Sequence, residues 1–75
     1  MENSDFDQLL AEYRAAVDRL VDEVHKEEAL ANSDHSIVEM ERWDDEEFKV
    51  QDAAKAALKA RAAYKDALRQ KNYGF

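Results

Sequence analysis

The stretch from Val50 to Arg69, VQDAAKAALKARAAYKDALR, decides the fold class of this chain. It holds eight alanines and neither glycine nor proline. Alanine is the strongest helix former because fixing it in a helix costs no side-chain entropy. At about 100° per residue, one face of the predicted helix carries mostly small side chains. That face consists of Val50, Ala54, Ala57, Arg61, Tyr64 and Leu68, flanked by Ala53 and Ala60. We expect it to pack closely against another helix.

An earlier helix is predicted by hydrophobic residues that recur at alternating spacings of four and three. These residues are Phe6, Leu10, Tyr13, Val17, Leu20 and Val24, widened by Leu9, Ala16 and Val21. The pattern predicts a helix from about residue 5 to about residue 31. The polar segment 32–36 predicts a turn, and Ser36 with Glu39 forms the S-x-x-E pattern that starts a helix. We therefore expect an all-α antiparallel hairpin in a single domain, residues 1–75, with its second arm over about 37–71.

The sequence leaves the continuity of the second arm open. No glycine or proline interrupts Ile37 to Asn72, which favours one long helix. However, Asp44 and Glu47 resemble a helix start, and Trp43 and Phe48 are placed to form a hydrophobic staple around it. The alternatives are a continuous helix, with Phe48 pointing away from the alanine-rich face, or a kink or break near 43–45.

Composition argues against several classes of protein. The 75-residue chain has no cysteine, so it has neither a disulfide framework nor a thiolate metal site. The first residues, MENSDFDQ, do not resemble a signal peptide, and no apolar run reaches the roughly 20 residues of a membrane span. His25 and His35 have acidic neighbours, but no Glu-x-x-His motif occurs. We expect a cytoplasmic protein with no metal, no cofactor and no catalytic activity.

The formal net charge of −7 is unevenly distributed. Residues 1–32 carry nine acids and three bases, residues 33–48 seven acids and one base, and residues 49–75 two acids and seven bases. This asymmetry suggests that the basic last helix lies along acidic helices of its own chain or of another chain. Because the basic residues are spread around their helix and the rest of the chain would repel phosphate, direct nucleic-acid binding is not expected. Membrane binding is not expected either, because the apolar residues of that helix are mostly alanine.

Chain size predicts a partner, because a single core of this length is marginally stable. If the turn lies at 33–35, residue 6 pairs with about residue 62, and the C-terminal apolar residues extend beyond the first helix. A homodimeric four-helix bundle would cover them. The aromatic and apolar residues predicted to contact a partner are Trp43, Phe48, Tyr64, Leu68, Tyr73 and Phe75.

Two functions are consistent with these features. The first is a small acidic helical module for protein–protein interaction, acting as a regulator, adaptor or co-chaperone. The alternative is an inhibitor that mimics nucleic acid and blocks a basic DNA- or RNA-binding protein, as phage antagonists do. The acidic face predicted for the alternative consists of Glu12, Asp18, Asp22, Glu23, Glu27, Glu28, Asp44, Asp45, Glu46 and Glu47.

Overall fold

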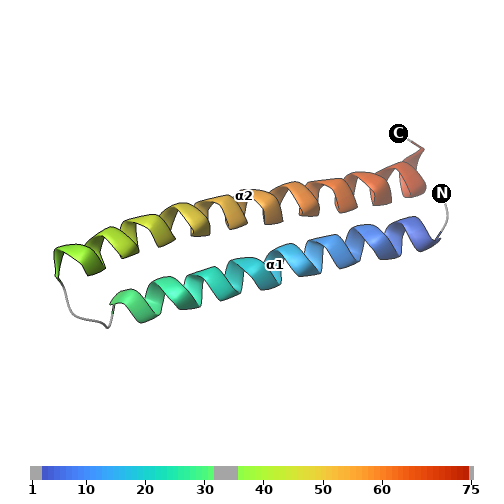
Figure 1. Ribbon diagram of the computed structural model, residues 1–75. Helices are drawn as coiled ribbons and strands as arrows, with labels where there is room; N and C mark the ends of the chain where they lie inside the picture. The colour runs from blue at the N-terminus through green and yellow to red at the C-terminus, as the bar shows by residue number, and fades with distance from the viewer. Residues whose placement is uncertain (1–2, 32–35, 75) are drawn as a thin grey trace.

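Two α-helices form the part of the chain that the structure, a computed structural model, describes, namely residues 3–31 and 36–74. Helix α1 spans Asn3–Ala31 and α2 spans Ile37–Tyr73. The helices lie side by side and antiparallel, with both chain ends at the same end of the molecule (Figure 1). The hairpin measures 55 × 18 × 12 Å, so it is a single layer of two helices. The predicted all-α hairpin is confirmed.

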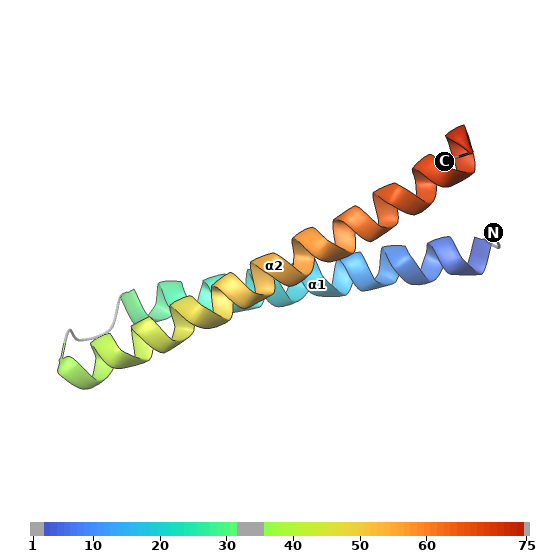
Figure 2. The same cartoon turned by 90° about the horizontal axis from the view of Figure 1, so that it is seen from above.

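Helix α2 runs through residues 43–45 without interruption, so the structure shows the continuous alternative (Figure 2). Without proline or glycine, no residue of this segment lacks a backbone donor or a side chain that restrains the helix. As the continuous alternative requires, Phe48 is 66% exposed. It therefore forms no covered staple with Trp43.

Both ends of α2 are capped. The Ser36 hydroxyl accepts a hydrogen bond from the backbone N–H of Glu39 at 3.3 Å, as the S-x-x-E pattern predicts. At the other end, Gly74 has a φ of 74° and its N–H donates to the Gln70 carbonyl oxygen at 3.0 Å. Glycine adopts this left-handed conformation without steric cost, which lets it end the helix.

The two helices meet along rows that follow a heptad pattern, which we call the seam. On α1 the buried or half-buried row is Phe6, Leu9, Tyr13, Ala16, Leu20, Glu23, Glu27 and Leu30. On α2 it is Glu39, Trp43, Glu46, Val50, Ala53, Ala57, Ala60, Tyr64 and Ala67. Alanines occupy the centre of the α2 row, so the seam buries little apolar surface. Among the described residues, the buried apolar side chains are Phe6, Ala53, Ala57 and Ala67.

The seam corrects the sequence prediction for α1 at two positions. The expected row places Val17 and Val24 in the seam, but they are 36% and 42% exposed, and Ala16 and Glu23 lie there instead. The expected row and the observed row both have heptad spacing and share Phe6, Tyr13 and Leu20, so the difference is a rotation of α1 about its own axis. In the α2 row, the alanine-rich face is placed as predicted at Val50 and Ala57, but Arg61 is exposed.

The predicted overhang is largely absent. Ala67 is buried, Tyr64 and Leu68 are half-buried, and the Lys71 ammonium lies 5.0 Å from the centre of the Phe6 ring. Helix α1 begins at Asn3, before the predicted start, so it extends far enough to cover this part of α2. The C-terminal end of α2, over its described residues, therefore does not need a second chain to cover it.

Candidate protein interface

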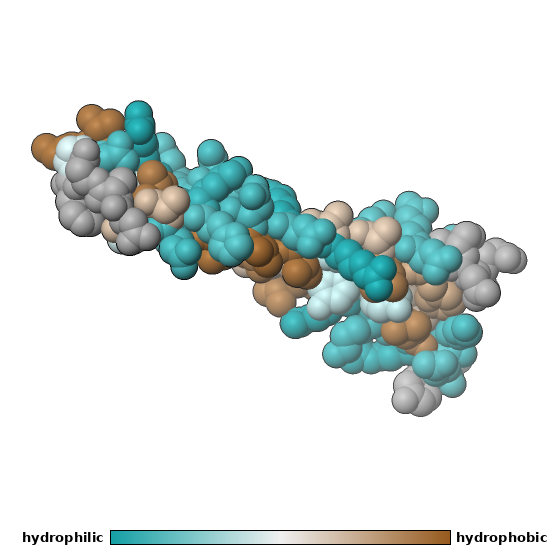
Figure 3. Space-filling model, turned by 90° about the horizontal axis from the view of Figure 1, so that it is seen from below, coloured by the Kyte–Doolittle hydropathy of each residue, from teal (hydrophilic) through white to brown (hydrophobic). Residues whose placement is uncertain are grey.

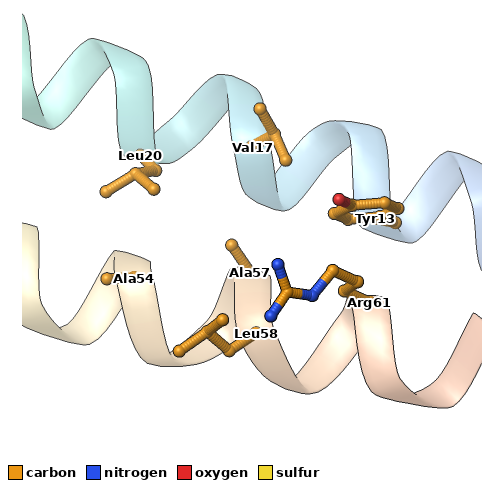
Figure 4. Close-up of a pocket in the computed structure, with 7 residues that line it drawn as sticks. All are labelled: Tyr13, Val17, Leu20, Ala54, Ala57, Leu58 and Arg61. Atoms are coloured by element: carbon orange, nitrogen blue, oxygen red, sulfur yellow. The ribbon is translucent and has the colours of Figure 1, made fainter.

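A groove crosses one side of the hairpin near its midpoint (Figure 4). Its lining comes from both helices and consists of Tyr13, Val17, Leu20, Ala54, Ala57, Leu58 and Arg61. The groove arises because small alanines of α2 face larger side chains of α1. Its volume is about 280 Å³, just under the roughly 300–1,000 Å³ typical of small-molecule sites. Its shape and lining suit a row of side chains from another helix.

Apolar side chains extend this groove along both helices. On α1, Val17, Val21 and Val24 follow each other at spacings of four and three, so they share one side of the helix. All three are exposed, and on α2 Leu58 is 53% exposed. We call Val17, Val21, Val24, Ala54, Leu58 and Arg61 the groove face. Hydrophobic side chains gather near the middle of the hairpin in Figure 3, and others lie at the loop end, where Ile37 and Val38 are exposed.

Arg61 places a positive charge in this apolar groove. In Figure 4 its guanidinium group lies over the middle of the groove, near Ala57 and Leu58. The ion pairs recorded between described residues are Lys26 with Asp22 and with Glu23, Arg42 with Glu39, and Arg69 with Asp66. Arg61 belongs to none of them. A guanidinium group with five donors is therefore available to a carboxylate from outside the chain.

A second polar feature lies inside the hairpin, where Glu23 of α1 meets Glu46 of α2. Both residues are buried, and neither Oε2 atom has a hydrogen-bond donor as partner within residues 3–31 and 36–74. A hydrogen bond to Glu23, together with burial, raises the pKa of Glu46. The same hydrogen bond, followed by the Lys26 ammonium at 3.2 Å from Glu23 Oε1, lowers the pKa of Glu23.

Nearby charges complete the environment of this pair. The hydrogen bond to Glu23, followed by the one to Asp22, raises the pKa of Lys26, which bridges the two carboxylates on α1. Lys49 of α2 acts on both glutamates as a more distant positive charge. Trp43, one turn before Glu46, donates its Nε1–H across the seam to Glu27 Oε1 at 3.1 Å. Acidic side chains therefore form part of the seam in the loop-proximal half.

The residues predicted to contact a partner are dispersed by the fold. Trp43, Tyr64 and Leu68 are half-buried, and Phe48 lies exposed on the outer side of α2. The Tyr73 side chain and Phe75 lie outside the described residues. The four side chains that the structure describes do not form one surface. Sequence reasoning overlooked Leu58, although its position four residues after Ala54 places it beside the alanine-rich face.

The predicted acidic residues are also divided between different environments. Glu23 and Glu46 are buried and Glu27 is half-buried in the seam. The others are exposed, namely Glu12, Asp18, Asp22, Glu28, Asp44, Asp45 and Glu47. Asp22 is paired with Lys26 at 3.2 Å. The acidic surface is therefore smaller than the sequence predicted.

Within residues 3–31 and 36–74, no three histidine, aspartate or glutamate side chains come together as metal ligands would. Neither helix, over its described length, is long and apolar enough to cross a membrane. Compared with family models, with curated proteins and with solved structures, the chain shows no significant match to any of them. The groove face is therefore the candidate functional site of the described residues.

Proposed function

We propose that this protein is a non-catalytic module for protein–protein interaction, in which two copies associate through the groove face to form a four-helix bundle. One observation carries the proposal: apolar side chains from both helices are exposed together beside a groove at the middle of the hairpin. Soluble chains seldom leave such a surface uncovered. A bundle of this kind would act as a regulator, adaptor or co-chaperone.

The small apolar core of a single hairpin also supports self-association on energetic grounds. The buried apolar side chains of the described residues are one phenylalanine and three alanines. Burying apolar surface contributes about 25 cal/mol per Å², so small side chains supply little stabilisation. Covering Val17, Val21, Val24 and Leu58 with a second hairpin adds a core layer that one hairpin lacks.

The experiment is light scattering after size exclusion, at several concentrations, on the natural chain and two variants. The natural chain should give a mass of about 17 kDa, twice its 8.7 kDa. Leu58→Glu should give the single-chain mass, because it buries a charge in the interface. Phe48→Glu is the matched control, since it makes the same change at an exposed apolar residue outside the groove face. A monomeric natural chain, or equal dissociation by both variants, would contradict the proposal.

The second candidate is the acidic mimic of nucleic acid. It is supported by the concentration of charge near the turn, where residues 22–47 carry eleven acids and two bases. The exposed acids Glu28, Asp44, Asp45 and Glu47 would supply the binding surface. Binding to a basic DNA- or RNA-binding protein that weakens steeply with salt would support it. Absence of such binding at low salt would remove it.

A further inference from the structure

We propose that the second copy packs against the groove face in the opposite direction, so that each helix runs antiparallel to its equivalent. The two copies are related by a two-fold axis that is perpendicular to α2 and passes beside Ala54. The inference rests on the proposed self-association and adds its orientation and its contacts. In this arrangement α2 runs antiparallel along α2 of the second copy, and α1 along α1. The two turns lie at opposite ends of the bundle.

One row of residues on α2 can pair with the same row of a second copy, because its charged and apolar residues match when the direction is reversed. Residues seven apart share one side of a helix in a bundle. Through Ala54, which lines the groove, this row reads Met40, Glu47, Ala54, Arg61 and Leu68. With a two-fold axis at Ala54, a residue that lies a given number of positions after Ala54 faces the residue of the second copy that lies the same number of positions before Ala54. Arg61 then faces Glu47 of the second copy, and Leu68 faces Met40.

The adjacent row gives a second charge pair. It reads Asp44, Gln51, Leu58 and Lys65. Lys65 lies eleven residues after Ala54 and Asp44 lies ten residues before it, so these side chains come within reach across the axis. Asp44, Glu47, Arg61 and Lys65 are all exposed, and none of them belongs to an ion pair recorded between described residues. The second copy would supply both missing counterions.

Helix α1 supplies apolar contact at the same level. Val17 lines the groove beside Ala54, and Val21 lies one turn further along on the same side. When α1 is paired with α1 of the second copy about this axis, these valines meet at the centre. The interface would therefore have an apolar middle formed by Val17, Val21 and Leu58, with charge pairs on either side.

Overall charge distinguishes this orientation from the other two-fold arrangement, in which both turns lie at the same end. Residues 22–47, around the turn, carry eleven acids and two bases, a net charge of −9. The rest of the chain carries seven acids and nine bases, a net charge of +2. Placing both turns together would bring two strongly acidic regions into contact. The antiparallel orientation places each acidic region beside the basic part of the other copy.

Charge reversal tests the pairing between Arg61 and Glu47. Arg61→Glu and Glu47→Arg should each raise the dimer dissociation constant by about tenfold or more, because like charges would then face each other. The double variant should recover the natural value to within about threefold. Lys59→Glu is the control, because this exposed lysine lies outside both rows and its reversal changes the net charge equally. Failure of the double variant to recover, or an equal effect of the control, would overturn the pairing.

Cysteine cross-linking tests the orientation, since the chain has no cysteine of its own. Ala54→Cys should oxidise to a linked dimer, because two copies of residue 54 meet at the axis. Glu47→Cys alone should stay unlinked, because its two copies lie about 21 Å apart along the helix. It should link when mixed with Arg61→Cys.

The outcomes separate the two proposals. A dimer in which Ala54→Cys links to Val17→Cys, and not to itself, would retain the proposed function and overturn the antiparallel orientation. A chain that stays monomeric by light scattering would remove the proposed self-association, and this orientation with it.

Discussion

The carboxyl groups of Glu23 on α1 and Glu46 on α2 face each other inside the hairpin, at positions where a heptad pattern normally places apolar side chains. Two ionised carboxylates can only accept hydrogen bonds, and both Oε2 atoms are buried without a donor from the described part of the chain. We predict that one proton held between them supplies that donor. The raised pKa of Glu46 and the lowered pKa of Glu23, each caused first by the hydrogen bond between the two side chains, favour this arrangement.

The pair predicts a dependence of hairpin stability on pH. The raised pKa of Glu46 gives a contribution that is complete below the ordinary glutamate pKa of 4.5 and is lost as pH rises through the raised value. The lowered pKa of Glu23 gives a contribution that is present above 4.5 and is lost as pH falls through the lowered value. The pair should therefore stabilise the hairpin most near pH 4.5, and less at neutral pH.

Replacement of Glu46 by glutamine tests this dependence, because an amide is a permanent donor. Glu46→Gln should raise the melting temperature at pH 7.5 and change it little at pH 4.5, as measured by circular dichroism. Glu41→Gln, at an exposed position of the same helix, should leave both melting temperatures unchanged. An equal rise at the two pH values would show that the effect comes from net charge and not from the shared proton.

The hydrogen bond from Trp43 Nε1 to Glu27 Oε1 predicts a second effect on stability. Trp43→Phe keeps an aromatic ring but removes the donor, so it should lower the free energy of unfolding by about 0.5–1.5 kcal/mol. Urea denaturation followed by circular dichroism measures the difference. Since Trp43 is the only tryptophan, its fluorescence also reports the contact. Glu27→Ala should shift the emission to longer wavelength, whereas Glu28→Ala, at an exposed neighbour, should not.

The two helices pack closely at the centre of the seam, because Ala53 is 0% exposed there. Ala53→Leu would insert three carbon atoms where the helices leave no space. It should lower the free energy of unfolding by about 1–3 kcal/mol. Ala63→Leu makes the same change at an exposed position of α2 and should have little effect. Equal stability of the two variants in urea would contradict this packing.

The hydrogen bond between the Ser36 hydroxyl and the Glu39 N–H predicts that the start of α2 depends on this cap. Ser36→Ala removes the acceptor for the Glu39 N–H and should cost about 1 kcal/mol of stability. Ser36→Asp retains an acceptor at the positive end of the helix and should preserve stability. Thermal unfolding of both variants measures the difference. An aspartate variant as unstable as the alanine variant would show that capping is not the cause.

The sequence alone was sufficient for the features that depend on neighbouring residues. The alanines between Val50 and Arg69 predict a helix because alanine loses least entropy on forming one, and Ser36 with Glu39 predicts where α2 begins. The continuity of α2 through 43–45 was left open because Asp44 and Glu47 resemble a helix start locally. Packing along the whole of α1 outweighs that local signal.

Which row of α1 faces α2 is determined only by the tertiary structure. On α1 several adjacent positions carry residues that could pack, so spacing alone could not decide between Val24 and Glu23. Two heptad rows start at Phe6, one through Val24 and the other through Glu23, and the rotation of α1 against α2 selects the second. Glu46 and Lys26 make the burial of Glu23 tolerable. That same choice leaves Val17, Val21 and Leu58 outside and creates the groove face. The spacing of hydrophobic residues and the polar segment 32–36 predict two helices, and only their mutual rotation determines which apolar surface remains exposed.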